Sequence, residues 1–296
     1  MKSIPKPRTR IFPLLLLLTL LCDKSAAGDP SYLLDQDIPY GHDDDRQVLD
    51  VIRRTTATAD PVLFYVHGGA WSSGGKERAI ASGLAVSMLR RGYVLVSANY
   101  RFTPPYAFPQ NAEDVAAAIA WVLANIGDYG GNPSQLFLLG HSAGAHLASL
   151  VAVHDAYLAR HGLGVNSIKG VIALDTQAYD LIDLAHQQGG QFGLFSVFRQ
   201  AFSNDPRIWH RASPALQVSP GAGLPAFAIC YTGGATGRTL YERRRQADRF
   251  ASRLRLHGAD AYVLSAIEKT HEQIMSEFGR EDDPLTSQAL SAIGAP

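Results

Sequence analysis

The chain has 296 residues, of which 46% are hydrophobic and 18% charged, so it can bury one sizeable core and is not a disordered tail. Basic and acidic side chains are equal in number, at 27 each. A balanced charge provides no basic field to gather phosphate groups, and we therefore expect no nucleic-acid partner.

Residues 1–27 have the order of features of an export signal. A basic stretch is followed by an apolar run at residues 11–21 and by small residues before Gly28. The apolar run is shorter than the ~20 residues that a membrane-spanning helix needs. We expect cleavage near Gly28, a secreted or periplasmic domain of residues 28–296, and no stable membrane insertion. An uncleaved anchor remains open, whereas Leu21 disfavours lipidation of Cys22.

Strand-length apolar runs alternate with longer segments in which apolar residues recur every three or four positions. The runs are residues 48–52, 62–66, 93–98, 136–139, 168–174, 226–231 and 261–264. The longer segments are residues 79–90, 112–126, 144–157 and 240–256. Continuous apolar runs are typical of strands covered on both faces. The alternation predicts an α/β fold, with a mostly parallel central sheet flanked by helices, in one domain.

Residues 181–204 interrupt this alternation. The segment contains three glycines and four phenylalanines and follows the run that ends at residue 174. It is either a small cap over a pocket or an ordinary surface connection.

A G-x-S-x-G motif occupies residues 140–144, between an apolar run and a helical segment. A nucleophile at this place must sit on a tight turn, and the flanking glycines allow the strand and helix to approach closely. We identify Ser142 as the candidate nucleophile. The alternative is a serine with only a structural role in the turn.

Two glycines also follow the run at 62–66, in the sequence His67-Gly68-Gly69-Ala70-Trp71. Backbone N–H groups aimed at the attacked carbonyl oxygen would stabilise the charge that develops there. We expect one donor from Ala143 and the other from Gly68 or Gly69, unless the glycines form a plain turn. Trp71 is expected to contact the substrate.

A serine hydroxyl needs a base to take its proton. His271 follows the last apolar run and is the strongest candidate. We expect His146 and His154, on the helical segment after Ser142, to be packed or solvated rather than catalytic.

These motifs resemble those of the α/β-hydrolase superfamily, and within it the carboxylesterases and kynurenine formamidases with HGGxW and GxSxG. The resemblance covers essentially all of residues 28–296. It implies an α/β-hydrolase fold, Ser142 and His271 as nucleophile and base, and no metal or organic cofactor.

The sequence departs from this family in the position of the acid. Most members carry an Asp after the strand before the last one, but residues 232–239 contain no carboxylate. Asp175, directly after the run at 168–174, is our candidate to orient His271. Glu242 is the rival, although a carboxylate there also suits a helix N-terminus, and a site without an acid remains open. We interpret the arginines at 243–245 as a solvated helix face.

Together these features predict a secreted serine hydrolase that cleaves small-molecule carboxylic esters through an acyl-enzyme. Arylformamide hydrolysis is an alternative, which the leader disfavours because tryptophan breakdown is expected inside cells. A non-catalytic ligand-binding protein of the same fold is a second alternative. The sequence predicts neither the acyl and alcohol specificity nor the oligomeric state.

Overall fold

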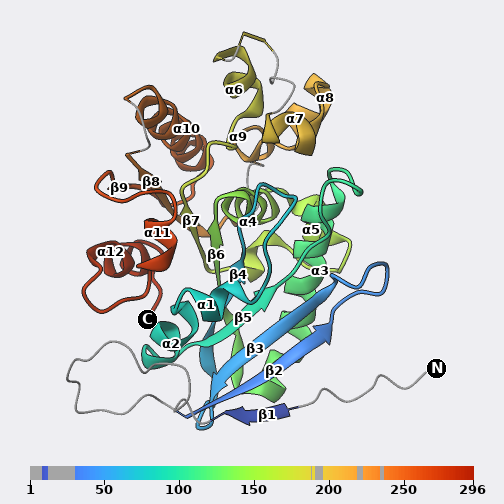
Figure 1. The fold of residues 1–296 in the computed structure, drawn as a ribbon, viewed down its shortest axis with the longest axis vertical. Coiled ribbons are helices and arrows are strands. Elements are labelled where there is room, and N and C mark those ends of the chain that lie inside the picture. Colours follow the sequence, from blue (N-terminus) through green and yellow to red (C-terminus); the bar gives the residue numbers. More distant parts are fainter. Residues whose placement is uncertain (1–8, 13–30, 188, 191–195, 219–222, 234–236) are drawn as a thin grey trace.

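A computed structural model describes residues 9–12, 31–187, 189–190, 196–218, 223–233 and 237–296. Over these residues a single sheet has nine strands in the order β1-β2-β3-β5-β4-β6-β7-β8-β9 (Figure 1). The strands are β1 (Thr9–Phe12), β2 (Tyr32–Pro39), β3 (Val48–Arg54), β4 (Asp60–Val66), β5 (Val94–Ala98), β6 (Gly131–His141), β7 (Gly170–Leu174), β8 (Ala226–Thr232) and β9 (Ala261–Ala266).

The predicted α/β fold with a mostly parallel sheet is confirmed. Neighbouring strands from β5 to β9 run parallel, whereas β1, β2, β3 and β5 pair antiparallel. All seven predicted strands are present. The prediction missed β2, whose register shifts between Asp35 and Ile38 and so lacks a regular two-residue period.

Most of the predicted leader lies outside the described residues, which include only β1 from this segment. In the part of the chain that is described, no helix combines the length and the apolar character needed to span a bilayer.

The helices cover both faces of the sheet. They are α1 (Arg78–Ala81), α2 (Leu84–Arg90), α3 (Gln110–Asn125), α4 (Ala143–Val153), α5 (Asp155–Ala159), α6 (Leu181–Gln187), α7 (Val197–Phe202), α8 (Pro206–Arg211), α9 (Pro214–Gln217), α10 (Gly237–Leu256), α11 (Gln273–Ser276) and α12 (Pro284–Ala292). Two single turns of 3-10 helix span Ile126–Tyr129 and Val165–Ser167.

Two of the predicted helices are interrupted. The segment at 79–90 divides into α1 and α2 at Gly83, which has a left-handed φ of 79°. The segment at 144–157 divides into α4 and α5 at His154, whose backbone is extended. In both cases one residue leaves the helical region of backbone space, and the apolar spacing continues across the break.

The core has two halves, one on each face of the sheet. Alternate residues of β4 point to opposite faces, as Phe64 and Tyr65 show. Phe64 belongs to the half that includes α3, α4 and α10, and Tyr65 to the half that includes α2, α11 and α12. Burial on both faces explains the continuous apolar runs in the sequence.

The segment at 181–204 forms α6 and α7, and its residues 188 and 191–195 lie outside the described part. In Figure 1, α6, α7, α8 and α9 gather at one end of the molecule, and β1 to β3 lie at the other.

Candidate active site

Ser142 occupies the sharp turn between β6 and α4. Its φ of 56° lies in the left-handed region, which is strained for a residue with a side chain. A Cβ at Gly140 would lie 2.4 Å from the Gly144 carbonyl oxygen, and one at Gly144 would lie 2.0 Å from the Val66 carbonyl oxygen. Both glycines are therefore required for α4 to begin so close to the ends of β6 and β4.

His271 and Asp175 are in direct contact. Asp175 follows β7 with a φ of 53°, and His271 follows β9. His271 Nδ1 lies 2.6 Å from Asp175 Oδ2. An imidazole that donates from Nδ1 to a carboxylate presents its Nε2 as an unprotonated base.

Asp175 is 1% exposed and is supplied with hydrogen-bond donors. Thr232, the last residue of β8, donates to it from its backbone N–H at 3.1 Å and from its hydroxyl at 2.8 Å. Burial raises the pKa of Asp175, but the hydrogen bond from His271 and the charge of Arg243 outweigh it and bring the pKa below its ordinary value. The carboxylate is therefore charged at neutral pH.

Ser142, Asp175 and His271 border a single cavity of about 180 Å³. The other lining residues are Ala70, Trp71, Ala143, Thr176, Gln177, Val197, Phe198 and Arg243. Ser142 and His271 share this cavity without a hydrogen bond between them. Such contacts often tighten only once a substrate is bound.

The loop after β4 reaches the same cavity. The Gly69 carbonyl oxygen accepts hydrogen bonds from the N–H groups of Ser72 and Ser73, which closes a tight turn. Gly69 has a φ of 124°, and a Cβ there would lie 2.1 Å from the Ser73 carbonyl oxygen. The next residue, Ala70, borders the cavity, so its N–H is a further candidate donor, one that the sequence pattern of two glycines did not indicate.

Backbone strain is concentrated around this cavity. Seven described residues other than glycine have a positive φ, and four of them line the cavity: Ala70, Trp71, Ser142 and Asp175. Such conformations cost about 1–3 kcal/mol each and persist where surrounding contacts hold them, typically at functional sites.

Trp71 forms an aromatic wall of the cavity together with Phe198 from α7; their ring centroids are 5.7 Å apart. The indole N–H of Trp71 donates to His146 Nδ1 at 3.2 Å, and His146 Nε2 donates to the Ala212 carbonyl at 2.7 Å. Burial lowers the pKa of His146 to about 4. As expected, His146 is a packed residue that holds Trp71.

His141 supports the loop that carries His271. Its Nε2 lies 2.8 Å from the His271 carbonyl oxygen, and the two rings are 4.6 Å apart. Burial first, and then the neighbouring His271, lower the pKa of His141 to about 4. A neutral His141 donates from Nε2 to this backbone carbonyl and adds no charge beside His271.

The prediction that residues 243–245 form a solvated helix face is wrong for Arg243. Its side chain is 12% exposed, compared with 68% for Arg244, and its Nη1 lies 3.0 Å from Asp175 Oδ2. Arg243 turns inward because it can pair with a buried carboxylate at the end of β7. The rival acid, Glu242, does not line the cavity.

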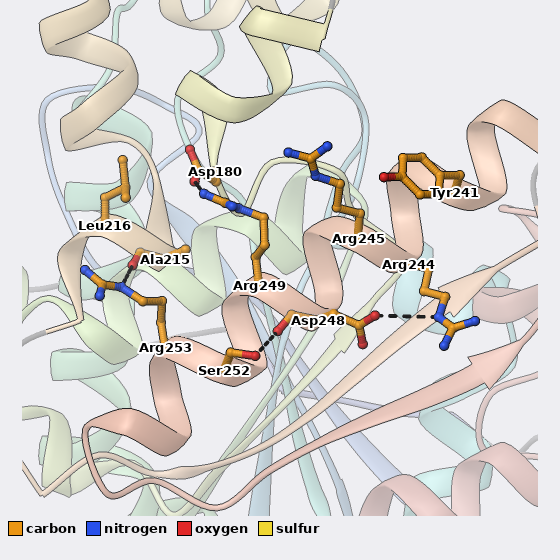
Figure 2. Close-up of a pocket in the computed structure, with 10 residues that line it drawn as sticks. All are labelled: Asp180, Ala215, Leu216, Tyr241, Arg244, Arg245, Asp248, Arg249, Ser252 and Arg253. Carbon is orange, nitrogen blue, oxygen red and sulfur yellow. Dashed lines mark hydrogen bonds and ion pairs between the residues drawn. The ribbon is translucent and has the colours of Figure 1, made fainter.

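A larger cavity of about 730 Å³ lies alongside α10, which provides most of its lining residues (Figure 2). None of Ser142, Asp175 or His271 lines it. Arginines on its walls are paired with carboxylates, as in the contacts of Arg249 with Asp180 at 2.7 Å and of Arg244 with Asp248 at 3.6 Å. The Arg249–Asp180 pair connects α10 to the segment before α6, whereas the Arg244–Asp248 pair lies within α10. Because Ser142, Asp175 and His271 line only the smaller cavity, that cavity is the candidate active site.

Cys230 is buried in β8, and burial raises the pKa of its thiol, which is therefore unreactive. Among the described residues, no three His, Cys, Asp or Glu side chains are grouped so that they could hold a metal ion.

A mostly parallel sheet between helices, with a serine at the elbow after β6 and a histidine after β9, defines the α/β-hydrolase class. Residues 49–227 match the profile of the BD-FAE family, and the chain belongs to that family.

Relatives with curated descriptions include esterase LipQ of Mycobacterium tuberculosis, which is 36% identical over 205 residues, covering 66% of this chain and 47% of LipQ. The isoprenylcysteine alpha-carbonyl methylesterase ICME of Arabidopsis thaliana is 31% identical over 260 residues, covering 84% of this chain and 57% of ICME. The chain thus spans about half the length of these relatives.

Solved structures show the same fold. A truncated carbohydrate esterase from gut microbiota superposes with a TM-score of 0.69 at 20% identity, over 86% of this chain and 93% of that protein. Esterase B of Lactobacillus rhamnosis superposes with a TM-score of 0.67 at 18% identity, over 90% and 84% of the two chains.

Proposed function

We propose that the protein is a serine hydrolase that cleaves carboxylic esters through an acyl-enzyme. The observation that carries this proposal is the 2.6 Å contact of His271 with Asp175 at the cavity that Ser142 borders. The esterase names of the relatives agree with it.

In the first half of the reaction Ser142 Oγ attacks the ester carbonyl carbon while His271 Nε2 takes the hydroxyl proton. The tetrahedral intermediate then expels the alcohol, which receives this proton from His271. In the second half water attacks the acyl-enzyme carbonyl while His271 takes its proton. The second tetrahedral intermediate then releases the carboxylic acid, and Ser142 Oγ regains a proton from His271. Asp175 holds the imidazole in the required tautomer and stabilises its positive charge.

The oxyanion of each intermediate would accept hydrogen bonds from backbone N–H groups. We assign Ala143, the residue after the nucleophile, and the loop at Gly69 and Ala70. The Gly68 N–H is a further candidate donor. A Cβ at Gly68 would lie 3.0 Å from His141 Nδ1 and 3.1 Å from Ser142 Cβ, so its lack of a side chain also leaves room for the nucleophile. Losing one such donor costs about 3 kcal/mol of transition-state stabilisation.

The small cavity and its wall of Trp71, Val197 and Phe198 favour a short acyl group. A panel of nitrophenyl esters of increasing acyl length tests this proposal with the wild type and Ser142→Ala. We expect turnover that is highest for short chains and absent in the variant. A fluorophosphonate probe should label the wild type only.

Two outcomes would replace the proposal. Turnover of N-formylkynurenine far above that of the aryl esters would identify an arylformamidase. A folded wild type that neither labels nor hydrolyses any ester would indicate a ligand-binding protein.

We also propose that the chain is exported and cleaved near Gly28. N-terminal sequencing of protein recovered from the periplasm or medium of an expressing bacterium tests this. A secreted form that retains residues 1–27 would contradict it.

A further inference from the structure

We propose that Arg243 is a positioning residue that sets the proton affinity of His271 by sharing the Asp175 carboxylate, which keeps His271 available as a base at lower pH. This inference rests on the proposed function, since it assigns Arg243 a role in the same site.

Arg243 and His271 contact the same oxygen atom. Asp175 Oδ2 lies 2.6 Å from His271 Nδ1 and 3.0 Å from Arg243 Nη1. Because both nitrogens contact one oxygen atom, His271 Nδ1 and Arg243 Nη1 are close neighbours. Arg243 Nη1 also donates to the Thr232 hydroxyl, which itself donates to Asp175 Oδ2 at 2.8 Å.

Two cations that share one carboxylate oppose each other. Protonation of His271 would place a second positive charge beside the guanidinium, and Arg243 already neutralises part of the charge of Asp175. Arg243 is 12% exposed and His271 is 35% exposed, so water screens this repulsion only in part. The effect lowers the proton affinity of His271, so that the neutral ring persists to lower pH.

The other groups around this pair do not duplicate the effect. His141, from the end of β6, is neutral because burial lowers its pKa to about 4. Glu272, the next residue in the chain, is exposed and paired with Arg78 of α1. Tyr179 and Cys230, which lie within electrostatic range of Asp175, stay neutral because burial raises the pKa of each. Among the described residues, Arg243 is therefore the permanent cation that contacts the same Asp175 carboxylate as His271.

The neighbouring Arg244 is a matched control. Its side chain is 68% exposed and pairs with Asp248 at 3.6 Å, on the face of α10 that borders the larger cavity (Figure 2). Replacing either arginine by methionine removes one positive charge and keeps much of the aliphatic length. Only Arg243 contacts Asp175.

The experiment measures the titration of His271 in the full chain by NMR, with the ring assigned by its loss in His271→Asn. We expect Arg243→Met to raise the titration midpoint by about one pH unit, a tenfold gain in proton affinity. Arg243→Lys, which keeps the positive charge, should reverse at least half of this rise, and Arg244→Met should leave the midpoint at its wild-type value. In a plot of kcat/KM against pH, the fall in activity on the acid side should shift to higher pH by the same amount as the midpoint.

An unchanged midpoint in Arg243→Met would overturn the inference, as would an equal shift in Arg244→Met. If Arg243→Met does not fold by circular dichroism, Arg243→Gln removes the charge and retains a hydrogen-bond donor, and it provides the same comparison. The NMR midpoint requires no turnover. Failure of the proposed function, seen as a wild type that neither labels nor hydrolyses esters, is therefore distinguishable from failure of this inference.

Discussion

Thr232 donates two hydrogen bonds to Asp175, one from its backbone N–H and one from its hydroxyl, at 3.1 and 2.8 Å. Thr232 ends β8, the strand after which most α/β-hydrolases carry their acid, and Asp175 follows the adjacent β7. The carboxylate that we propose as the acid therefore follows the adjacent strand, and the end of β8 supplies it with hydrogen-bond donors. Because the ends of two neighbouring parallel strands lie side by side, a carboxylate on either one can reach the same histidine.

Replacement of Thr232 by valine tests the hydrogen bond from its hydroxyl to Asp175. The variant keeps the backbone donor and the side-chain volume but loses the hydroxyl, which leaves a buried carboxylate with one hydrogen bond fewer. We expect the free energy of unfolding to fall by about 1–3 kcal/mol and kcat to decrease. Urea denaturation and ester hydrolysis measure the two effects.

Thr103 provides the control for that variant. Its hydroxyl is buried without a hydrogen-bond partner, so Thr103→Val should leave the free energy of unfolding unchanged or raise it. A Thr232→Val protein as stable and as active as the wild type would show that Asp175 does not need the hydroxyl.

The fold and the residues brought to the cavity could be inferred from the sequence because each depends on a local pattern. Apolar runs mark strands buried on both faces, and the glycines at 140 and 144 mark a turn that no larger residue permits. Asp175 could be proposed because it directly follows a strand next to that of the nucleophile.

The role of Arg243 could not be inferred in this way. Its local sequence, three consecutive arginines near the start of a helix, is typical of a solvated surface. Whether one of the three turns inward depends on the distance between the start of α10 and the end of β7, which only the packed structure defines. The alanine at position 70 was missed for a similar reason, since alanine carries no sign of backbone strain.

The assignment of the acid makes a second prediction. Asp175→Asn should lower kcat by about 10³-fold or more, because an amide no longer holds the base tautomer of His271. Glu242→Gln should stay within about threefold of the wild type, since Glu242 does not border the cavity. Thermal denaturation of both variants separates lost catalysis from lost folding. The reverse pattern would assign the acid to Glu242, and two active variants would mean that the site works without an acid.

A third prediction concerns the elbow. In Gly144→Ala the new Cβ would lie 2.0 Å from the Val66 carbonyl oxygen, a backbone atom that cannot move independently. We expect the variant to lose about 2–4 kcal/mol in the free energy of unfolding, together with most of its activity. Gly127→Ala is the control, because a Cβ there meets nothing within 4 Å. Equal stabilities of the two variants by urea denaturation would contradict the close approach of β4 and α4.

The fourth prediction is a loss of stability in mild acid that originates in the buried histidines. Burial lowers the pKa of His146 from 6.5 to about 4, and it lowers the pKa values of His67 and His141 to about 4 as well. Between pH 6.5 and about pH 4 these histidines are protonated in the unfolded chain but neutral in the folded chain. Stability should therefore be complete above pH 6.5, fall as the pH drops towards 4, and stop falling from this cause below that value.

His146→Gln isolates one of these contributions. Near pH 5 each buried ring should add about 1 kcal/mol per pH unit to the slope of the unfolding free energy, so the variant should show a slope shallower by that amount. Urea denaturation at several pH values from about 7 to about 5 measures the slope. Lost packing in the variant lowers the unfolding free energy at every pH and does not change the slope. His161→Gln, at an exposed position, should leave the slope as it is. If the slopes of His146→Gln and the wild type coincide, the buried ring of His146 is already protonated in the folded protein, and its hydrogen bond from Trp71 cannot exist as described.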